Sequence, residues 1–86
     1  MRILILGASG MLGSTLFREL FLNDDENTFG TIRSEEKRKF FKRTMNEHLF
    51  SDIDIKKFEE VKKVLKEINP NIVINCIGII NKYKWF

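Results

Sequence analysis

The chain has few of the residues that hold small proteins together covalently or through a metal. It contains one cysteine, Cys76, and one histidine, His48, so these residues cannot form an internal disulfide or a tetrahedral zinc site by themselves. The longest apolar runs, residues 3–6 and 72–74, are far shorter than the roughly 20 residues of a membrane span. No small-residue cleavage site follows the N-terminus, and we therefore expect a cytoplasmic protein without a membrane partner.

Proline and glycine are also scarce, which leaves no candidate linker between domains. The only proline is Pro70, and three of the five glycines fall between residues 7 and 13. We therefore expect one small domain or a piece of a larger one. Hydrophobic residues make up 43% of the chain and charged residues 31%, a balance that excludes general disorder. The net charge of +3 favours an anionic ligand without requiring one.

Hydrophobic periodicity predicts strands and helices in alternation. In residues 12–22 and 56–68, apolar side chains recur at spacings of three and four, which is the helical period. The expected order is a strand at 2–6, a helix at 12–22, a strand at 28–33, a helix from 34 to about 43, a weak strand at 47–53, a helix at 56–68 and a strand at 71–80. This alternation predicts the α/β class, with a parallel sheet and helices on both faces.

Single residues in the predicted helices carry more local expectations. Ser34 should cap its helix alone, because Lys37 stands where a capping box needs an acid or a glutamine. Phe40 and Phe41 are the expected inward contacts of the same helix. Phe58 is expected on the buried face of the helix at 56–68, and the pair Asn69-Pro70 should end that helix.

The most informative segment is the glycine-rich turn at residues 7–13, between the first strand and the first helix. Gly7 lets the chain turn sharply, Gly10 leaves room for a diphosphate, and Gly13 lets the helix pack closely. Backbone N–H groups in the first helical turn, helped by the helix dipole, would then face an anion. The predicted ligand is the diphosphate of a dinucleotide. The spacing is G-x-x-G-x-x-G rather than the commoner G-x-G-x-x-G, and the alternative is a turn that is tight for structural reasons alone.

A second signal is Arg33, at the end of the second predicted strand. About 20 residues after such a turn, an acid indicates the free ribose 2′-hydroxyl of NAD, whereas a nearby arginine accommodates the 2′-phosphate of NADP. Arg33 and the following Ser34 therefore favour NADP(H), with NAD(H) as the alternative. Arg33 could also be a solvated charge at a strand end, since Glu35 and Glu36 lie close to it.

The segments that carry these signals resemble a known family. Residues 3–13, ILILGASGMLG, and residues 69–79, NPNIVINCIGI, are similar to extended short-chain dehydrogenases/reductases. Among these they look most like nucleotide-sugar reductases of the dTDP-4-dehydrorhamnose reductase type. The resemblance ends at about Asn81 and leaves residues 82–86 unmatched. It implies that residues 1–86 are the N-terminal part of an NAD(P)-binding Rossmann domain, with strand order 3-2-1-4 and no substrate domain.

The resemblance also implies which residues touch the cofactor. Asp54 and Ile55 would hold the adenine, with Asp52 as the alternative if the register slips by two. Cys76, Ile77 and Gly78 would lie along the ribose and approach the nicotinamide. The expected cofactor-binding residues are Gly7, Ser9, Gly10, Met11, Leu12, Gly13, Arg33, Ser34, Asp54, Ile55, Cys76, Ile77 and Gly78.

The catalytic pair of the resembling family is missing. That family transfers a hydride from a nicotinamide to a sugar ketone with the help of a Tyr-x-x-x-Lys pair, and the only tyrosine, Tyr83, has no lysine at that spacing. We therefore expect the NADP(H)-binding portion of an oxidoreductase of dTDP-rhamnose biosynthesis, without catalytic residues or a metal site. Residues 72–79 of its last strand should be an exposed apolar edge through which the chain associates with itself.

Other interpretations remain beside this one. The chain could be a non-catalytic nucleotide-binding module or a truncated remnant. It could also be a small basic nucleic-acid binder, because six of the residues from 33 to 43 are basic, although a solvated helix face is the simpler reading and we expect no nucleic-acid partner. His48 is expected at the surface without a partner. Cys76 is expected to be a small buried hydrophobe, with a reactive thiol as the alternative.

Overall fold

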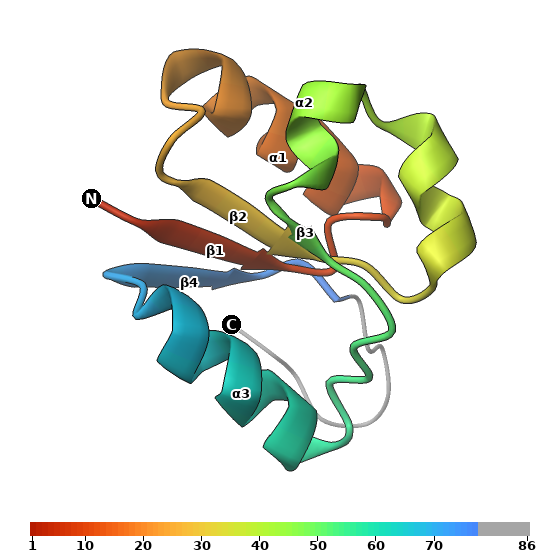
Figure 1. Ribbon diagram of the computed structural model, residues 1–86, viewed down its shortest axis with the longest axis vertical. Coiled ribbons are helices and arrows are strands. Elements are labelled where there is room, and N and C mark those ends of the chain that lie inside the picture. Colours follow the sequence, from red (N-terminus) through yellow and green to blue (C-terminus); the bar gives the residue numbers. More distant parts are fainter. Residues whose placement is uncertain (78–86) are drawn as a thin grey trace.

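The computed structural model describes residues 1–77, which form a parallel sheet with helices on both faces (Figure 1). Each strand pairs in parallel with its neighbours in the order β3-β2-β1-β4, which confirms the predicted α/β class and strand order. The central strand β1 lies between β2 and β4, so that Leu4 is level with Phe29 on one side and Val73 on the other. The strands are β1 (Ile3–Leu6), β2 (Thr28–Thr31), β3 (Leu49–Phe50) and β4 (Ile72–Asn75).

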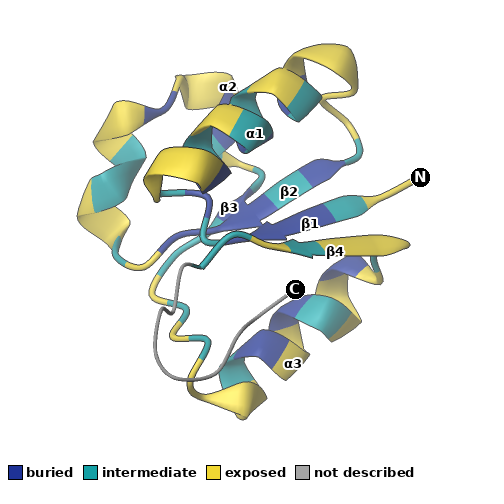
Figure 2. Cartoon of the chain, turned by 180° about the vertical axis from the view of Figure 1, so that it is seen from behind, coloured by how far each residue is buried: buried dark blue, intermediate teal, exposed yellow. Residues whose placement is uncertain are grey.

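The helices cover the two faces of the sheet unequally (Figure 1). Helices α1 (Met11–Asn23) and α2 (Arg43–Asn46) pack on one face, and α3 (Phe58–Ile68) packs on the other. Because side chains alternate along a strand, β1 contributes Ile5 to the first face and Leu4 to the second, and both are fully buried. Figure 2 shows that burial is concentrated in the inner strands β1 and β2 and on the inner sides of the helices, whereas β4 is mostly exposed. None of the helices within residues 1–77 is long and apolar enough to cross a membrane.

The third and fourth strands are shorter than predicted. Instead of residues 47–53, β3 pairs only over Leu49–Phe50, because Asp52 has a φ of 59° and left-handed backbone cannot continue a strand ladder. The predicted strand at 71–80 pairs over Ile72–Asn75, and its last three positions, 78–80, lie outside the described residues. The first two strands and the helices α1 and α3 differ from the prediction only at their ends.

The helix predicted from 34 to about 43 is wrong as a single element. A 3₁₀-helix, η1 (Glu35–Phe40), is followed by extended backbone and then by α2. Phe40 is the last residue of η1, whereas Phe41 belongs to the extended backbone that follows it. Phe41 is buried, whereas Phe40 is 59% exposed, so only one of the two expected inward contacts is correct. Ser34 precedes η1 in the expected capping position, but its side chain makes no capping hydrogen bond. Instead, the backbone carbonyl of Ser34 accepts the N–H of Lys37 and closes the first turn of η1.

Helix α3 follows its predicted apolar face except at its first residue. Phe58 is 67% exposed, and Figures 1 and 2 show that the first turn of α3 lies farther from the sheet than its last turn. The helix ends as predicted at Asn69-Pro70. Asn69 adopts the left-handed conformation with φ 50°, and its N–H donates to the carbonyl of Leu65 at 2.8 Å. The buried positions of the face are Val61, Val64 and Ile68.

The prediction that His48 has no partner is wrong. Its half-buried ring stacks on Phe29 with centroids 4.8 Å apart, and meets the ring of Phe21 edge-on at 5.4 Å. Its Nδ1 lies 3.0 Å from the backbone carbonyl oxygen of Thr28. A carbonyl can only accept, so Nδ1 carries the proton in this contact. His48 is therefore a packing residue that joins α1 to β2, and no local sequence pattern indicates such long-range contacts.

Strand β4 forms an edge of the described sheet. Ile72 is 41% exposed and Val73 is 45% exposed, although both belong to a strongly apolar segment. The expected exposed apolar edge is therefore present within residues 1–77. Whether copies of the chain associate through it stays a prediction.

Candidate cofactor-binding site

A pocket of about 390 Å³ opens at the carboxyl ends of β1, β2 and β4. From β1 the chain crosses over one face of the sheet to β2, and from β3 it crosses over the other face to β4. The carboxyl end of β1 is therefore the switch point at which ligands of open α/β sheets bind. The pocket is lined by Gly7, Ser9, Gly10, Thr31, Ile32, Arg33, Ile53, Asp54, Ile55, Lys56, Cys76 and Ile77.

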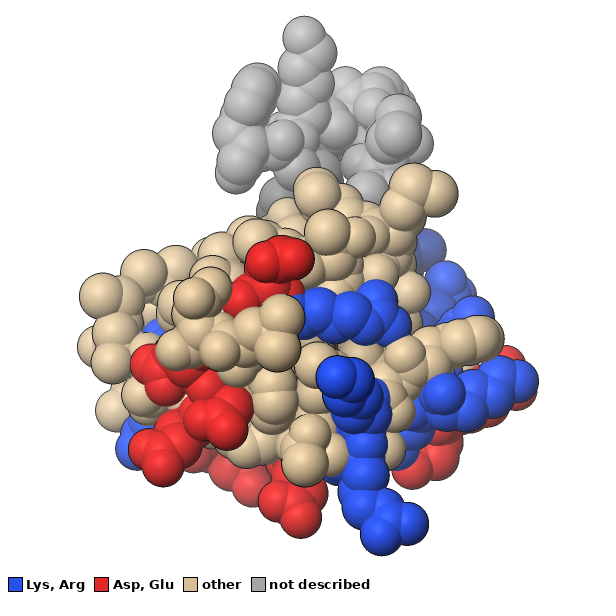
Figure 3. Space-filling view, turned by 90° about the horizontal axis from the view of Figure 1, so that it is seen from above, with Lys and Arg blue, Asp and Glu red and all other residues tan. Residues whose placement is uncertain are grey.

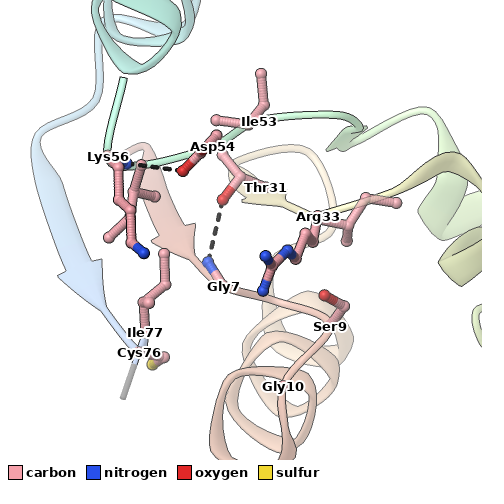
Figure 4. Close-up of a pocket in the computed structure, with 12 residues that line it drawn as sticks. Gly7, Ser9, Gly10, Thr31, Arg33, Ile53, Asp54, Lys56, Cys76 and Ile77 are labelled. Atoms are coloured by element: carbon pink, nitrogen blue, oxygen red, sulfur yellow. Dashed lines mark hydrogen bonds between the residues drawn. The ribbon is translucent and has the colours of Figure 1, made fainter. Parts of the chain in front are cut away.

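The turn out of β1 is held in place by β2. Gly7 has a φ of 85°, a conformation that favours glycine. Its N–H donates to Oγ1 of Thr31 at 3.0 Å, and the N–H of Ala8 donates to the backbone carbonyl of Thr31 at 2.7 Å (Figure 4). A Cβ atom at Gly7 would also lie 2.6 Å from Cγ1 of Ile77. The expected role of Gly7 as the residue that turns the chain is therefore confirmed.

The other two glycines of the turn meet opposite surroundings. A Cβ atom at Gly13 would lie 1.9 Å from the carbonyl oxygen of Gly7, so the first turn of α1 can pack on the glycine turn only without a side chain there. A Cβ atom at Gly10 would meet nothing closer than that same oxygen at 3.6 Å. Gly10 is exposed and has ordinary extended backbone, φ −77° and ψ 173°. The protein itself therefore leaves the space in front of Gly10 open.

Helix α1 begins with backbone donors that the described chain does not satisfy. The N–H of Ser14 donates to the carbonyl of Gly10 at 2.9 Å, but those of Met11, Leu12 and Gly13 donate to no other residue within 1–77. Gly10 also has no side chain to cap them. The side chains of Met11 and Leu12 are 92% and 68% exposed and do not line the pocket. As expected, these residues can serve an anion only through their backbone N–H groups.

Arg33 lines the pocket, whereas its neighbour Ser34 does not. Figure 4 shows the guanidinium of Arg33 extending over the glycine turn. The Glu35 carboxylate, expected to blur the local charge, is bound elsewhere, accepting from the hydroxyl of Ser51 and, at 2.7 Å, from Nε of Arg38. The hydrogen bond from Ser51 and the nearby Arg38 hold the pKa of Glu35 below its ordinary value of 4.5.

The loop between β3 and α3 forms the wall of the pocket beyond β2. Asp54 and Ile55 both line it, but the exposed Asp52 does not, so the structure favours the first register over the alternative. Oδ1 of Asp54 accepts a hydrogen bond from the backbone N–H of Lys56 at 3.0 Å (Figure 4). The backbone carbonyl of Asp54 accepts one from the backbone N–H of Lys57 at 2.9 Å. These two hydrogen bonds shape the loop as a turn whose side chains border the pocket.

Cys76 and Ile77 complete the pocket after β4, and Gly78 lies outside the described residues. Cys76 is half-buried rather than fully buried and packs against the apolar cluster on the α1 face of the sheet. Burial raises the pKa of its thiol above the ordinary value of 9.0. The thiol form is therefore favoured at neutral pH, which agrees with the expected apolar role.

The sequence reasoning missed four residues of the pocket. Thr31 and Ile32 precede Arg33, and the strand-end position that pointed to Arg33 could also have pointed to them. Ile53 and Lys56 flank the Asp54-Ile55 pair. No local sequence signal distinguished Ile53 and Lys56 from the other apolar and basic residues of the chain. The missed residues are Thr31, Ile32, Ile53 and Lys56. Within residues 1–77, no group of three or more His, Cys, Asp or Glu could hold a metal ion.

The basic residues between 33 and 43 do not act as one surface. Arg33 borders the pocket, whereas Arg38 points inward and donates to the carbonyls of Asn46 at 2.6 Å and Leu49 at 2.9 Å. Seen from above, a group of Asp and Glu lies on one side of the molecule, and on the other side Lys and Arg are interspersed with further Asp and Glu (Figure 3). Part of the basic run therefore holds the fold together.

Comparison with known proteins agrees with this arrangement. Residues 3–86 match the model of the NAD dependent epimerase/dehydratase family, past Asn81, where the resemblance in the sequence was expected to end. Among curated proteins, no match to the chain was found. The family model covers nearly the whole chain and includes every strand and helix around the pocket. The chain therefore belongs to the NAD dependent epimerase/dehydratase family, whose cofactor is a nicotinamide dinucleotide.

Proposed function

We propose that the chain binds NADP(H) in this pocket, as the N-terminal part of the cofactor-binding domain of a nucleotide-sugar oxidoreductase resembling dTDP-4-dehydrorhamnose reductase. The observation that carries the proposal is the open space at Gly10 beside unsatisfied N–H groups of α1, at the switch point of the sheet. A diphosphate needs such a place, because its oxygens accept hydrogen bonds and its charge is favoured at a helix N-terminus.

The residues around the pocket fit the remaining parts of a dinucleotide. The Asp54 carboxylate can accept from the amino group of an adenine, and Ile55 provides an apolar wall for the base. Arg33 can bind the phosphate that distinguishes NADP(H) from NAD(H), because a guanidinium pairs with phosphate through two parallel hydrogen bonds. Cys76 and Ile77 border the end of the pocket nearest β4, where we place the ribose next to the nicotinamide.

The proposal assigns binding, and not the reduction itself, to these residues. When bound, the cofactor supplies a hydride for a ketone of a sugar nucleotide. Residues 1–86 contain no Tyr-x-x-x-Lys pair, so the proposal assigns the protonation of the resulting oxygen to none of them. A second candidate function is a nucleotide-binding module without catalysis. Dinucleotide binding without turnover of a 4-keto sugar nucleotide would favour that candidate.

Titration of the purified chain with NADPH and NADH tests the proposed function. We expect NADPH fluorescence to report binding, with a lower Kd for NADPH than for NADH. Arg33→Gln should reduce this preference because it removes the group assigned to the 2′-phosphate. Absence of binding by either dinucleotide at millimolar concentration would contradict the proposal.

A further inference from the structure

The pocket contains a second cation that the proposed function does not use. Lys56 lines the pocket from the loop before α3, and Arg33 lines it from the end of β2. Figure 4 shows the ammonium of Lys56 and the guanidinium of Arg33 extending into the pocket on either side of Gly7. The pocket therefore has two cationic walls, with the glycine turn between them.

Neither cation is neutralised by the described chain. The ion pair found within residues 1–77 joins Arg38 to Glu35 and involves neither Arg33 nor Lys56. Among residues 1–77, Asp54 is the only acid that lines the pocket, and its Oδ1 accepts the backbone N–H of Lys56 rather than the ammonium. This hydrogen bond fixes the backbone that carries the Lys56 side chain. The pocket thus has an excess of positive charge beyond the helix N-terminus.

The two cations differ in the anions they suit. The planar guanidinium of Arg33 suits a terminal phosphate, which offers several oxygens to a fork of donors. The ammonium of Lys56 is a compact point charge, which suits the diffuse charge of a diphosphate bridge. In Figure 4 Lys56 extends toward Gly7 and Ile77, near the glycine turn at which the diphosphate is placed.

We propose that Lys56 neutralises the diphosphate of the bound dinucleotide from the side of the β3–α3 loop, opposite the N–H groups of α1. This inference rests on the proposed function and adds a residue that acts on both dinucleotides. Arg33 distinguishes NADP(H) from NAD(H), whereas Lys56 strengthens the binding of both, since both contain the diphosphate. Lys56 thereby strengthens the binding of both dinucleotides without changing the preference for NADP(H) over NAD(H).

Four forms of the full chain test the inference: the wild type, Lys56→Gln, Lys57→Gln and Lys56→Arg. Lys57 is the matched control, because it is the adjacent exposed lysine but does not line the pocket. Kd values for NADPH and NADH would be measured at low and at moderate salt. Lys56→Gln should raise both Kd values by the same factor, about tenfold, and reduce their salt dependence. Lys57→Gln should change neither, and Lys56→Arg should retain most of the affinity.

The outcomes separate the two proposals. If the wild type binds and Lys56→Gln binds equally well, the role of Lys56 is wrong and the proposed function stands. If Lys56→Gln weakens NADPH alone, Lys56 reads the 2′-phosphate, and the diphosphate assignment is wrong. If the wild type binds neither dinucleotide, both proposals fail. Circular dichroism and a thermal midpoint for each variant would show that a lost affinity does not come from unfolding.

Discussion

Gly10 and Gly13 are separated by one helical turn, but they limit the chain in different ways. A side chain at Gly13 would overlap the backbone of the glycine turn, whereas a side chain at Gly10 would enter the pocket. The fold therefore requires a glycine at 13, whereas a glycine at 10 is required only by the diphosphate site proposed above. This difference makes it possible to separate folding from binding by single substitutions.

Gly10→Leu should abolish dinucleotide binding while the chain remains folded. The backbone at Gly10 is extended and accepts any residue, so the loss of stability should not exceed about 1 kcal/mol, mainly from a poorer residue before the helix. The added side chain would occupy the space assigned to the diphosphate. NADPH titration and urea unfolding of the same preparation would check both parts, and retained binding would contradict the assignment.

Gly13→Ala should destabilise the fold even though it adds only one methyl group. The new Cβ would lie 1.9 Å from the carbonyl oxygen of Gly7, so α1 or the glycine turn must move. We expect a loss of about 3 kcal/mol or more, at the upper end of overpacking effects. The midpoint of urea unfolding measures it, and an unchanged midpoint would show that α1 does not pack as described.

At the scale of elements, the segment between β2 and α3 depends on side-chain hydrogen bonds to backbone. Arg38 in η1 donates to the carbonyls of Asn46 at the end of α2 and Leu49 in β3. The cation thus joins three elements that are too short to be stable alone. The same segment leads from Arg33 on one wall of the pocket to Asp54 on the other.

Arg38→Met should destabilise the chain by about 1–3 kcal/mol, since it removes the charge-assisted hydrogen bonds to two backbone carbonyls and the exposed ion pair with Glu35. Lys39→Met is the matched control in the same 3₁₀-helix, because Lys39 is exposed and its ammonium lies 5.4 Å from the centroid of the Phe40 ring. Thermal or urea unfolding of both variants would check the difference. Equal effects of the two substitutions would contradict the role given to Arg38.

Glu35 should make this segment sensitive to acid. Its pKa is lowered in the folded chain, so its contribution to stability is present above its ordinary value of 4.5 and is lost as the pH falls through the lower folded value. Glu35→Gln should therefore reduce the loss of thermal midpoint below about pH 4.5. Glu36→Gln, at the adjacent exposed residue, should keep the acid sensitivity of the wild type. If the thermal midpoints of both variants fell equally as the pH is lowered, Glu35 would not be the source of the acid sensitivity.

At the scale of the whole molecule, the sheet is well covered on its α1 face and poorly covered along its β4 edge. Three phenylalanines pack on the α1 face, Phe17, Phe21 and Phe41. In β4, Ile72 is 41% exposed and Val73 is 45% exposed within the described chain. Unpaired backbone beside exposed apolar side chains is a template for pairing with another strand. The edge of β4 is thus the part of the described surface best suited to self-association.

We expect the 86-residue chain to associate at high concentration through β4. Val73→Lys should reduce association, because a charge at an edge strand opposes strand pairing. Leu22→Lys is the matched control, since Leu22 is 71% exposed but lies on α1, away from the sheet edge. Light scattering over a range of concentrations would measure the effect, and a monomeric wild type would show that the edge does not pair.

Much of the fold was predictable from local pattern. The glycine turn and the apolar runs in residues 3–6 and 72–74 indicated the parallel sheet, because each pattern extends over several residues and suits one type of element. Residues 35–46 were not predictable in this way. Their apolar residues, Phe40, Phe41 and Met45, are too few to define one buried helix face, so tertiary packing decided which of them is buried.

The sequence by itself determined the order of strands and helices and the conformation of the glycine turn, because periodicity and glycine content act over short stretches of chain. Only the tertiary structure decided which distant residues share the pocket. Thr31, the Asp54–Lys56 loop and Cys76 belong to three separate segments and meet because parallel strands end at the same edge of the sheet. The second cation became visible there, since Lys56 looks like any other lysine of a charged segment until the crossover to α3 brings it opposite Arg33.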